Sequence, residues 1–138
     1  AVRGASPESD IKVEFVVEGR IELEPAVQPA WSPVPCLALQ DCFAEKLLAN
    51  SDRWADRHAC ARDLVDLAVL RARTGPAPEG VWRRVAQAYG LGVRDDLRRA
   101  LAQFRELPGF GEGCIRRLGL SDTTTLRSGI TLLTRDLE

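Results

Sequence analysis

Residues 43–53 read FAEKLLANSDR, and residues 61–68 read ARDLVDLA. In both stretches, apolar side chains recur three and four positions apart, which is the spacing of one face of an α-helix. These side chains are Phe43, Ala44, Leu47 and Leu48 in the first stretch, and Ala61, Leu64, Val65 and Ala68 in the second. The pattern predicts two amphipathic helices, over residues 40–53 and 59–73, that pack on each other.

Four more helices are predicted after this pair, over residues 79–89, 94–106, 113–118 and 122–136. Pro78, Gly90 and Pro108 provide start and stop signals, and Ser121 or Asp122 can cap the last helix. The sequence GFGEG at residues 109–113 predicts a turn. The packing sides of the helices over 79–89 and 94–106 are expected to be Val81, Trp82, Val85 and Tyr89, and Leu97, Leu101 and Phe104.

The region before residue 36 has a different pattern. Apolar and polar residues alternate over residues 11–17 and 20–24, with Glu18-Gly19 between them, which predicts a β-hairpin with one buried face. Four prolines over residues 25–35 favour an extended crossing. We therefore predict an α+β fold. It has a flexible lead-in (residues 1–10), a β-hairpin and Pro-rich crossing (residues 11–35), and a helical domain (residues 36–138).

Composition places the chain among average globular proteins. Of its 138 residues, 45% are hydrophobic and 28% charged, and the net charge is -1. These values exclude a disordered chain and the strong positive field of a non-specific nucleic-acid binder. No apolar run is long enough to span a bilayer. The four cysteines form no CxxC pair, which argues against structural zinc and favours reduced thiols in a bacterial cytoplasm.

The two opening stretches also carry the densest polar pattern. Lys46 and Arg53 share one side of the first predicted helix, and Arg62, Asp63 and Asp66 share one side of the second. A lysine can offer its charge to phosphate oxygens, and a neighbouring carboxylate can orient that lysine, hold a metal-bound water or act as a base. The alternative is a solvated helix face with ordinary ion pairs.

The same residues resemble a known pair of motifs. FAEKLLANSDR followed by RDLVDL is similar to the "aEKl.A…R" and "RDl.Dl" motifs of the AbiEii/AbiGii-type nucleotidyltransferase toxins. The resemblance covers mainly residues 11–73. It implies a bacterial toxin with a polymerase-β-like nucleotidyltransferase domain, paired with a cognate protein or transcriptional-regulator antitoxin in a toxin–antitoxin or phage-defence module. It also implies transfer of a nucleotide from an NTP to an acceptor, with tRNA as a candidate, and Mg²⁺ as cofactor.

The resemblance assigns roles residue by residue. Lys46 matches the lysine that meets the nucleotide phosphates, Asp63 matches the essential aspartate, and Asp66 is its second acid; these are the expected catalytic residues. Arg53 and Arg62 match basic positions expected to bind the nucleotide together with Lys46. Glu14 resembles the third carboxylate of such enzymes and is the expected metal ligand, although it also fits the outward half of an alternating strand.

The chain departs from the family pattern before Lys46, where no Gly-Ser followed by Asp-x-Asp is present. Two such carboxylates are what bind the metal ions of these enzymes. We therefore expect the chain to be the C-terminal portion of a longer toxin and to be inactive alone. The alternatives are a non-catalytic helical interaction module that binds nucleotide, RNA or a protein antitoxin, and a plain structural domain.

A second set of residues has side chains of the kind that bind nucleic acid. Tryptophans 31, 54 and 82 and the arginines of the helix predicted over residues 94–106 can stack on or grip nucleic acid. Aromatic core packing and a solvated helix face explain the same residues. Sequence alone leaves both explanations open.

Overall fold

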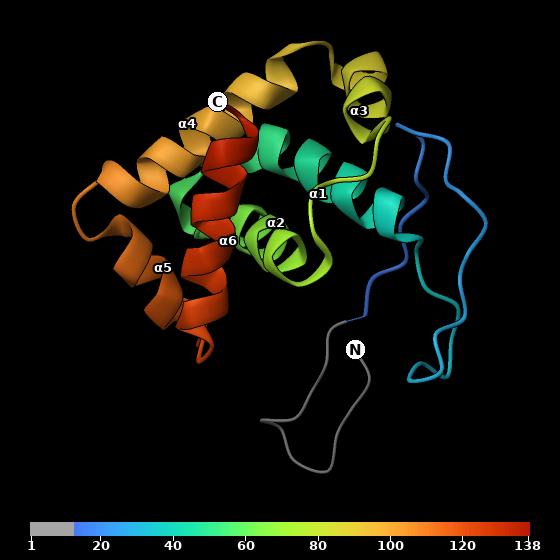
Figure 1. The fold of residues 1–138 in the computed structure, drawn as a ribbon, viewed down its shortest axis with the longest axis horizontal. Helices are drawn as coiled ribbons and strands as arrows, with labels where there is room; N and C mark the ends of the chain where they lie inside the picture. The colour runs from blue at the N-terminus through green and yellow to red at the C-terminus, as the bar shows by residue number, and fades with distance from the viewer. Residues whose placement is uncertain (1–12) are drawn as a thin grey trace.

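A computed structural model describes residues 13–138, and its described part contains six α-helices (Figure 1). They are α1 (Leu39–Arg53), α2 (Arg62–Thr74), α3 (Val81–Tyr89), α4 (Gly92–Glu106), α5 (Phe110–Arg117) and α6 (Thr123–Asp136), with a 3-10 turn, η2 (Arg57–Ala59), between α1 and α2. Each predicted helix is confirmed, with ends shifted by at most three residues. The lead-in predicted over residues 1–10 lies outside the described residues.

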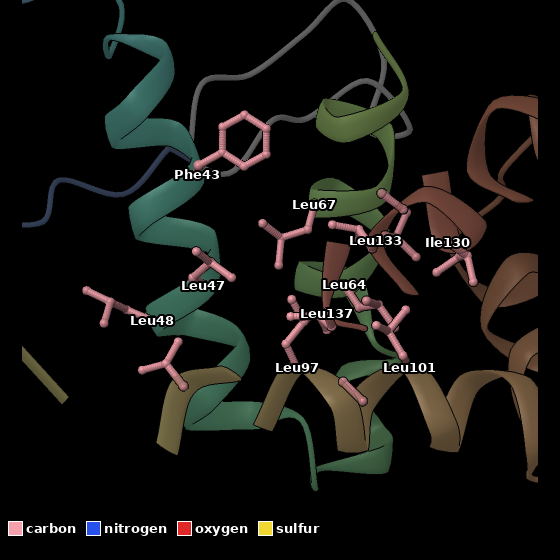
Figure 2. Close-up of a cluster of buried hydrophobic side chains, with 14 of the residues drawn as sticks. Phe43, Leu47, Leu48, Leu64, Leu67, Leu97, Leu101, Ile130, Leu133 and Leu137 are labelled. Atoms are coloured by element: carbon pink, nitrogen blue, oxygen red, sulfur yellow. The ribbon is translucent and has the colours of Figure 1, made fainter. Parts of the chain in front are cut away.

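The centre of the core lies between α1, α2, α4 and α6, as Figure 2 shows, and the core also includes Val81 and Val85 of α3 and Ile115 of α5. Leucines from all four helices meet there, and Phe43 of α1 closes one end of the cluster. The apolar faces predicted for α1 and α2 are buried, except that Ala61 is partly buried and precedes α2, because the 3.6-residue period turns these side chains toward the neighbouring helices. Tyr89 differs from its prediction, since it is exposed and its hydroxyl donates to Asp52 Oδ2 at 3.1 Å.

The closest helix contact is between α2 and α6. A Cβ atom built on Gly129 of α6 would lie 1.9 Å from the carbonyl oxygen of Ala68 in α2. Only glycine allows the two backbones to approach this closely, because any side chain would collide with a main-chain atom that cannot rotate away. Gly129 therefore sets the distance between α6 and the helix that carries Asp63 and Asp66.

The predicted β-hairpin is wrong. The structure has no β-strand within residues 13–138, so the fold is helical rather than α+β; residues 11 and 12 lie outside the described residues. The apolar side chains of the expected first strand have no surface to cover, and Phe15 is 98% exposed. At the expected turn, the Glu18 carboxylate accepts hydrogen bonds from the backbone and guanidinium of Arg20. A lone hairpin cannot bury its apolar face, and here no further sheet supports it.

The segment before α1 is instead extended and fastened by side chains. Asp41 of α1 is fully buried; its Oδ2 accepts from the Glu24 backbone N–H at 2.9 Å, and its Oδ1 accepts from Arg84 Nη2 of α3 at 2.7 Å. Further along, Val27 and Cys36 form an isolated antiparallel bridge. The Pro-rich segment is thus held near α1 by two contacts, the Val27–Cys36 bridge and the hydrogen bond from Glu24 to buried Asp41.

The turn predicted over residues 109–113 is also wrong for most of its length, because α5 begins at Phe110. Gly109, with φ of +72°, precedes α5, whereas Gly111 and Gly113 lie inside it. At Gly111 a Cβ atom would be 2.6 Å from the carbonyl oxygen of Phe104, so this glycine permits contact with α4. Among residues 13–138 no helix has the length and apolar character needed to cross a membrane.

Candidate functional site

The candidate site lies where α2 turns back along α1. The connection between them contains η2 and two non-glycine residues in the left-handed region, Cys60 with φ of 53° and Ala61 with φ of 50°. This tight reversal places the last turn of α1 beside the first turn of α2, so that Arg53 and Asp63, ten positions apart, face each other. The corner holds the polar residues of both motifs.

Asp63 is the buried anchor of this corner. Its residue exposure is 3%, and Arg53 at the end of α1 donates to it from Nη2 to Oδ1 at 2.7 Å and from Nε to Oδ2 at 3.0 Å. Asp63 is the second residue of α2, where the positive end of the helix dipole favours a carboxylate. The Arg53–Asp63 pair therefore ties the two helix ends together.

Lys46 sits between two carboxylates of α2. Its Nζ atom is 2.5 Å from Asp66 Oδ2 and 3.7 Å from Asp63 Oδ1. The side chains of Lys46 and Asp66 are 38% and 48% exposed, so solvent reaches this end of the cluster, whereas Asp63 lies beneath it. Two acids one helical turn apart thus hold one accessible ammonium group.

Two of the sequence-predicted residues lie outside these contacts. Arg62, the first residue of α2, is exposed, and its side chain forms no ion pair or hydrogen bond with any residue from 13 to 138. Glu14 is exposed in the extended segment before α1. The structure therefore brings together Lys46, Arg53, Asp63 and Asp66, and leaves Arg62 at the edge of the same corner.

The cluster can serve as a phosphate site if one contact changes. Lys46 and Arg53 balance the charges of Asp63 and Asp66. An incoming phosphate that bonded to Lys46 would compete with Asp66, whose exposed side chain can turn into water at little cost. Asp63 would stay in place, because Arg53 holds both of its oxygens. Without a ligand, the Lys46 ammonium is thus paired with Asp66, whose side chain can move, and lies close to Asp63, which Arg53 holds in place.

A second ionic cluster, which sequence reasoning missed, lies next to Lys46 in the chain. The Glu45 carboxylate binds Arg20 Nη2 at 2.6 Å, and the same nitrogen is 2.7 Å from Glu18 Oε2. Burial, followed by the hydrogen bond to Glu18, raises the pKa of Glu45 to about 7; the hydrogen bond from Arg20 lowers the pKa of Glu18 to about 2. In the sequence, only the adjacent Glu45 and Lys46 hint at this cluster, because Arg20 lies 25 residues before Glu45.

Comparison with known proteins agrees with the motif pair. The family model described as "Nucleotidyl transferase AbiEii toxin, Type IV TA system" matches residues 1–113. The chain belongs to this family. The AbiEii match includes all four residues of the cluster and ends within α5. No curated protein and no solved structure gives a match.

Membership in the AbiEii family implies a toxin of a type IV toxin–antitoxin system, with an antitoxin as partner. A nucleotidyl transferase family also implies an NTP and a divalent metal. The cluster does not fit that metal, because Arg53 binds both oxygens of Asp63 and Lys46 binds Asp66. Across residues 13–138, no three histidine, cysteine, aspartate or glutamate side chains are grouped to hold an ion. The metal role of Glu14 therefore stays a prediction.

Proposed function

We propose that this chain supplies the phosphate-binding side of a nucleotidyltransferase toxin, with Lys46 as the residue that contacts the NTP phosphates. The observation that carries the proposal is the position of the Lys46 ammonium, 2.5 Å from Asp66 and 3.7 Å from buried Asp63. An ammonium group is a compact point charge that suits phosphate oxygens. The Lys46 side chain is exposed enough for a ligand to reach its ammonium group, and the two carboxylates of α2 hold that group beside the helix.

The neighbouring residues position Lys46 in this proposal. Asp63 fixes the base of the cluster through Arg53, and Asp66 holds the ammonium until phosphate replaces it. Once released, the Asp66 carboxylate lies beside the bound phosphates and is the group available to orient an acceptor or accept its proton. Arg62 adds a positive charge that pairs with no acid among residues 13–138, at the exposed edge where the far end of a triphosphate or an acceptor phosphate would lie.

The reaction is nucleotidyl transfer. An acceptor hydroxyl oxygen bonds to the α-phosphorus of the NTP and gives its proton to a base, for which the released Asp66 carboxylate is the candidate. The bond from that phosphorus to the bridging oxygen breaks, and pyrophosphate leaves with the electron pair. Lysine charge near the leaving phosphates stabilises the negative charge that develops there. The acceptor belongs to the proposal, with tRNA as the first candidate. A cytoplasmic location and a role in phage defence belong to it as well.

The test is nucleotide-dependent stabilisation of the purified chain. A ligand that binds only the native state raises the unfolding free energy by about 2.7 kcal/mol at a hundredfold excess over Kd. We expect each NTP to raise the melting temperature of the wild-type chain and to have no such effect on Lys46→Ala. Arg127→Ala is the matched control, because it removes a positive charge that forms an exposed ion pair with Glu112, away from the corner.

Two outcomes would contradict the proposal. If Lys46→Ala retains the full nucleotide-dependent shift, the phosphates bind elsewhere. If no nucleotide stabilises the wild-type chain, the non-catalytic alternative gains support, namely a helical interaction module that binds RNA or the antitoxin. A transfer assay with labelled NTP and tRNA then follows for any nucleotide that gives a Lys46-dependent shift.

A further inference from the structure

A groove lies between α3 and the start of α4, with a volume of about 420 Å³. Trp82 and Arg83 line it from α3, Arg94 lines it from α4, and Leu91 lies in the turn between the helices. Its size is in the range of sites for small ligands. We call this feature the α3–α4 groove; none of its residues belongs to the Lys46 cluster.

The arginines of the groove, Arg83 of α3 and Arg94 of α4, differ from Arg98 and Arg99 further along α4. Arg98 and Arg99 pair with acids of their own helix, at 2.7 Å from Asp95 and 3.6 Å from Asp96. Arg94 instead lies over the Trp82 ring, with its guanidinium carbon 4.3 Å from the ring centroid. Within residues 13–138, neither Arg94 nor Arg83 is ion-paired. The groove therefore carries two positive charges that the described residues leave without acidic partners.

The other surfaces of the groove complement these charges. Leu91 is 88% exposed, so an apolar side chain lies open at its rim. The first turn of α4, whose backbone N–H groups have no partners within the helix, has no side-chain cap. The groove thus combines a flat stacked pair, an apolar rim and donors suited to an anion.

We propose that the α3–α4 groove binds a nucleotide unit, with the base against Trp82, Arg94 and Leu91 and the phosphate against Arg83 and the start of α4. A nucleotide joins a planar, largely apolar ring to an anion, and so matches both parts of the groove. The unit can belong to a free nucleotide or to a single-stranded RNA. This inference does not rest on the Lys46 site, because it uses different helices and requires no triphosphate.

The test uses the full chain with three probes: a labelled single-stranded RNA hexanucleotide, AMP and inorganic phosphate. We expect the hexanucleotide to bind in a fluorescence anisotropy titration, and AMP to compete better than phosphate. Tighter binding of the hexanucleotide than of AMP assigns the groove to an RNA strand, and equal binding assigns it to a free nucleotide. Lack of binding by both, or equal competition by phosphate and AMP, overturns the proposal.

Variants locate the binding. Arg94→Ala and Arg83→Ala are each expected to weaken binding by about tenfold, the value of one lost stacking or phosphate contact. Arg116→Ala on α5, far from α3 in Figure 1, is the matched control and should bind like the wild type. Equal losses in Arg94→Ala and Arg116→Ala would reduce the effect to net charge and overturn the proposal.

A conservative variant tests the geometry. Arg94→Lys keeps the positive charge but removes the flat guanidinium that lies over Trp82. We expect it to bind AMP several-fold more weakly than the wild type while keeping its helical circular dichroism. Wild-type affinity for AMP in Arg94→Lys would show that stacking plays no part and would overturn the assignment of a base to the groove.

Discussion

The guanidinium of Arg53 binds both carboxylate oxygens of Asp63, with Nη2 2.7 Å from Oδ1 and Nε 3.0 Å from Oδ2. This pair joins the last turn of α1 to the first turn of α2, and the Asp63 carboxylate also lies 3.7 Å from the Lys46 ammonium. The same buried acid thus holds the helix corner and the candidate phosphate-binding lysine. A substitution of Asp63 is therefore expected to change both the stability of the corner and the position of Lys46, so the two effects have to be separated with substitutions at other residues.

Asp63→Ala should therefore lower stability as well as activity. Its removal leaves Arg53 without a partner at the corner, and we expect a loss of about 1–3 kcal/mol in the free energy of unfolding. Asp66→Ala is the matched control, because its 48% exposed side chain forms a solvent-accessible pair worth less than about 1 kcal/mol. Urea unfolding of both variants measures the difference. Equal losses would show that Asp63 does not hold the corner.

Lys46→Ala should separate function from folding. Lys46 is partly exposed, and its removal leaves Asp66 in solvent and Asp63 bonded to Arg53. We expect the complete toxin with this substitution to lose growth inhibition while its unfolding free energy changes by less than about 1 kcal/mol. The readouts are growth after induced expression and urea unfolding of the purified protein. Full toxicity would remove Lys46 from the site.

Gly129→Ala should be strongly destabilising. The new methyl group would meet the Ala68 carbonyl oxygen at 1.9 Å, so α6 would have to move away from α2, at a cost of about 1–3 kcal/mol or more. Gly113→Ala in α5 is the matched control, since nothing lies within 4 Å of its added Cβ atom, and it should be neutral or stabilising by up to about 1 kcal/mol. Similar melting temperatures for the two variants would contradict the close contact.

The Glu18–Glu45 pair should make stability depend on pH in two directions. The pKa of Glu45 is raised to about 7 in the folded state, so the native protein holds the extra proton and stability falls as pH rises from about 4.5 to about 7. The pKa of Glu18 is lowered to about 2, so its contribution is present above about 4.5 and is lost as pH falls toward 2. Glu45→Gln should remove the decline between about 4.5 and 7, as measured by urea unfolding at several pH values. An unchanged slope would contradict this assignment.

Sequence periodicity predicted the helices and the faces that carry Lys46, Arg53, Asp63 and Asp66, but the predicted site also included Arg62 and Glu14, which lie outside the contacts of the cluster. Lys46, Arg53 and Asp63 come together because helical spacing fixes the face of each residue and a short connection forces α2 back along α1. The hairpin failed for the opposite reason. An alternation of apolar and polar residues, such as the one around Phe15, indicates only which side chains would share a face of a strand. The strand itself forms only where another strand can pair with it, and Phe15 is exposed instead.

The contacts that sequence reasoning missed join distant parts of the chain. Glu45 meets Arg20 across 25 residues, and Arg84 reaches Asp41 across 43. Asp41 looked like an ordinary acid in the first turn of a helix, and its complete burial depends on α3 and the extended segment together. No local pattern encodes such a pair, because each partner by itself is typical of an exposed helix face.

The backbone contact between Gly129 and Ala68 also bears on the order in which the helices pack during synthesis. During synthesis, α2 leaves the ribosome well before α6, which begins at Thr123. Until α6 is present, the apolar face of α2 lacks the helix that approaches its backbone most closely. The contact of Gly129 with Ala68 therefore forms only after translation has passed residue 129, whereas the pairs of Lys46 and Arg53 with α2 need only the two earlier helices.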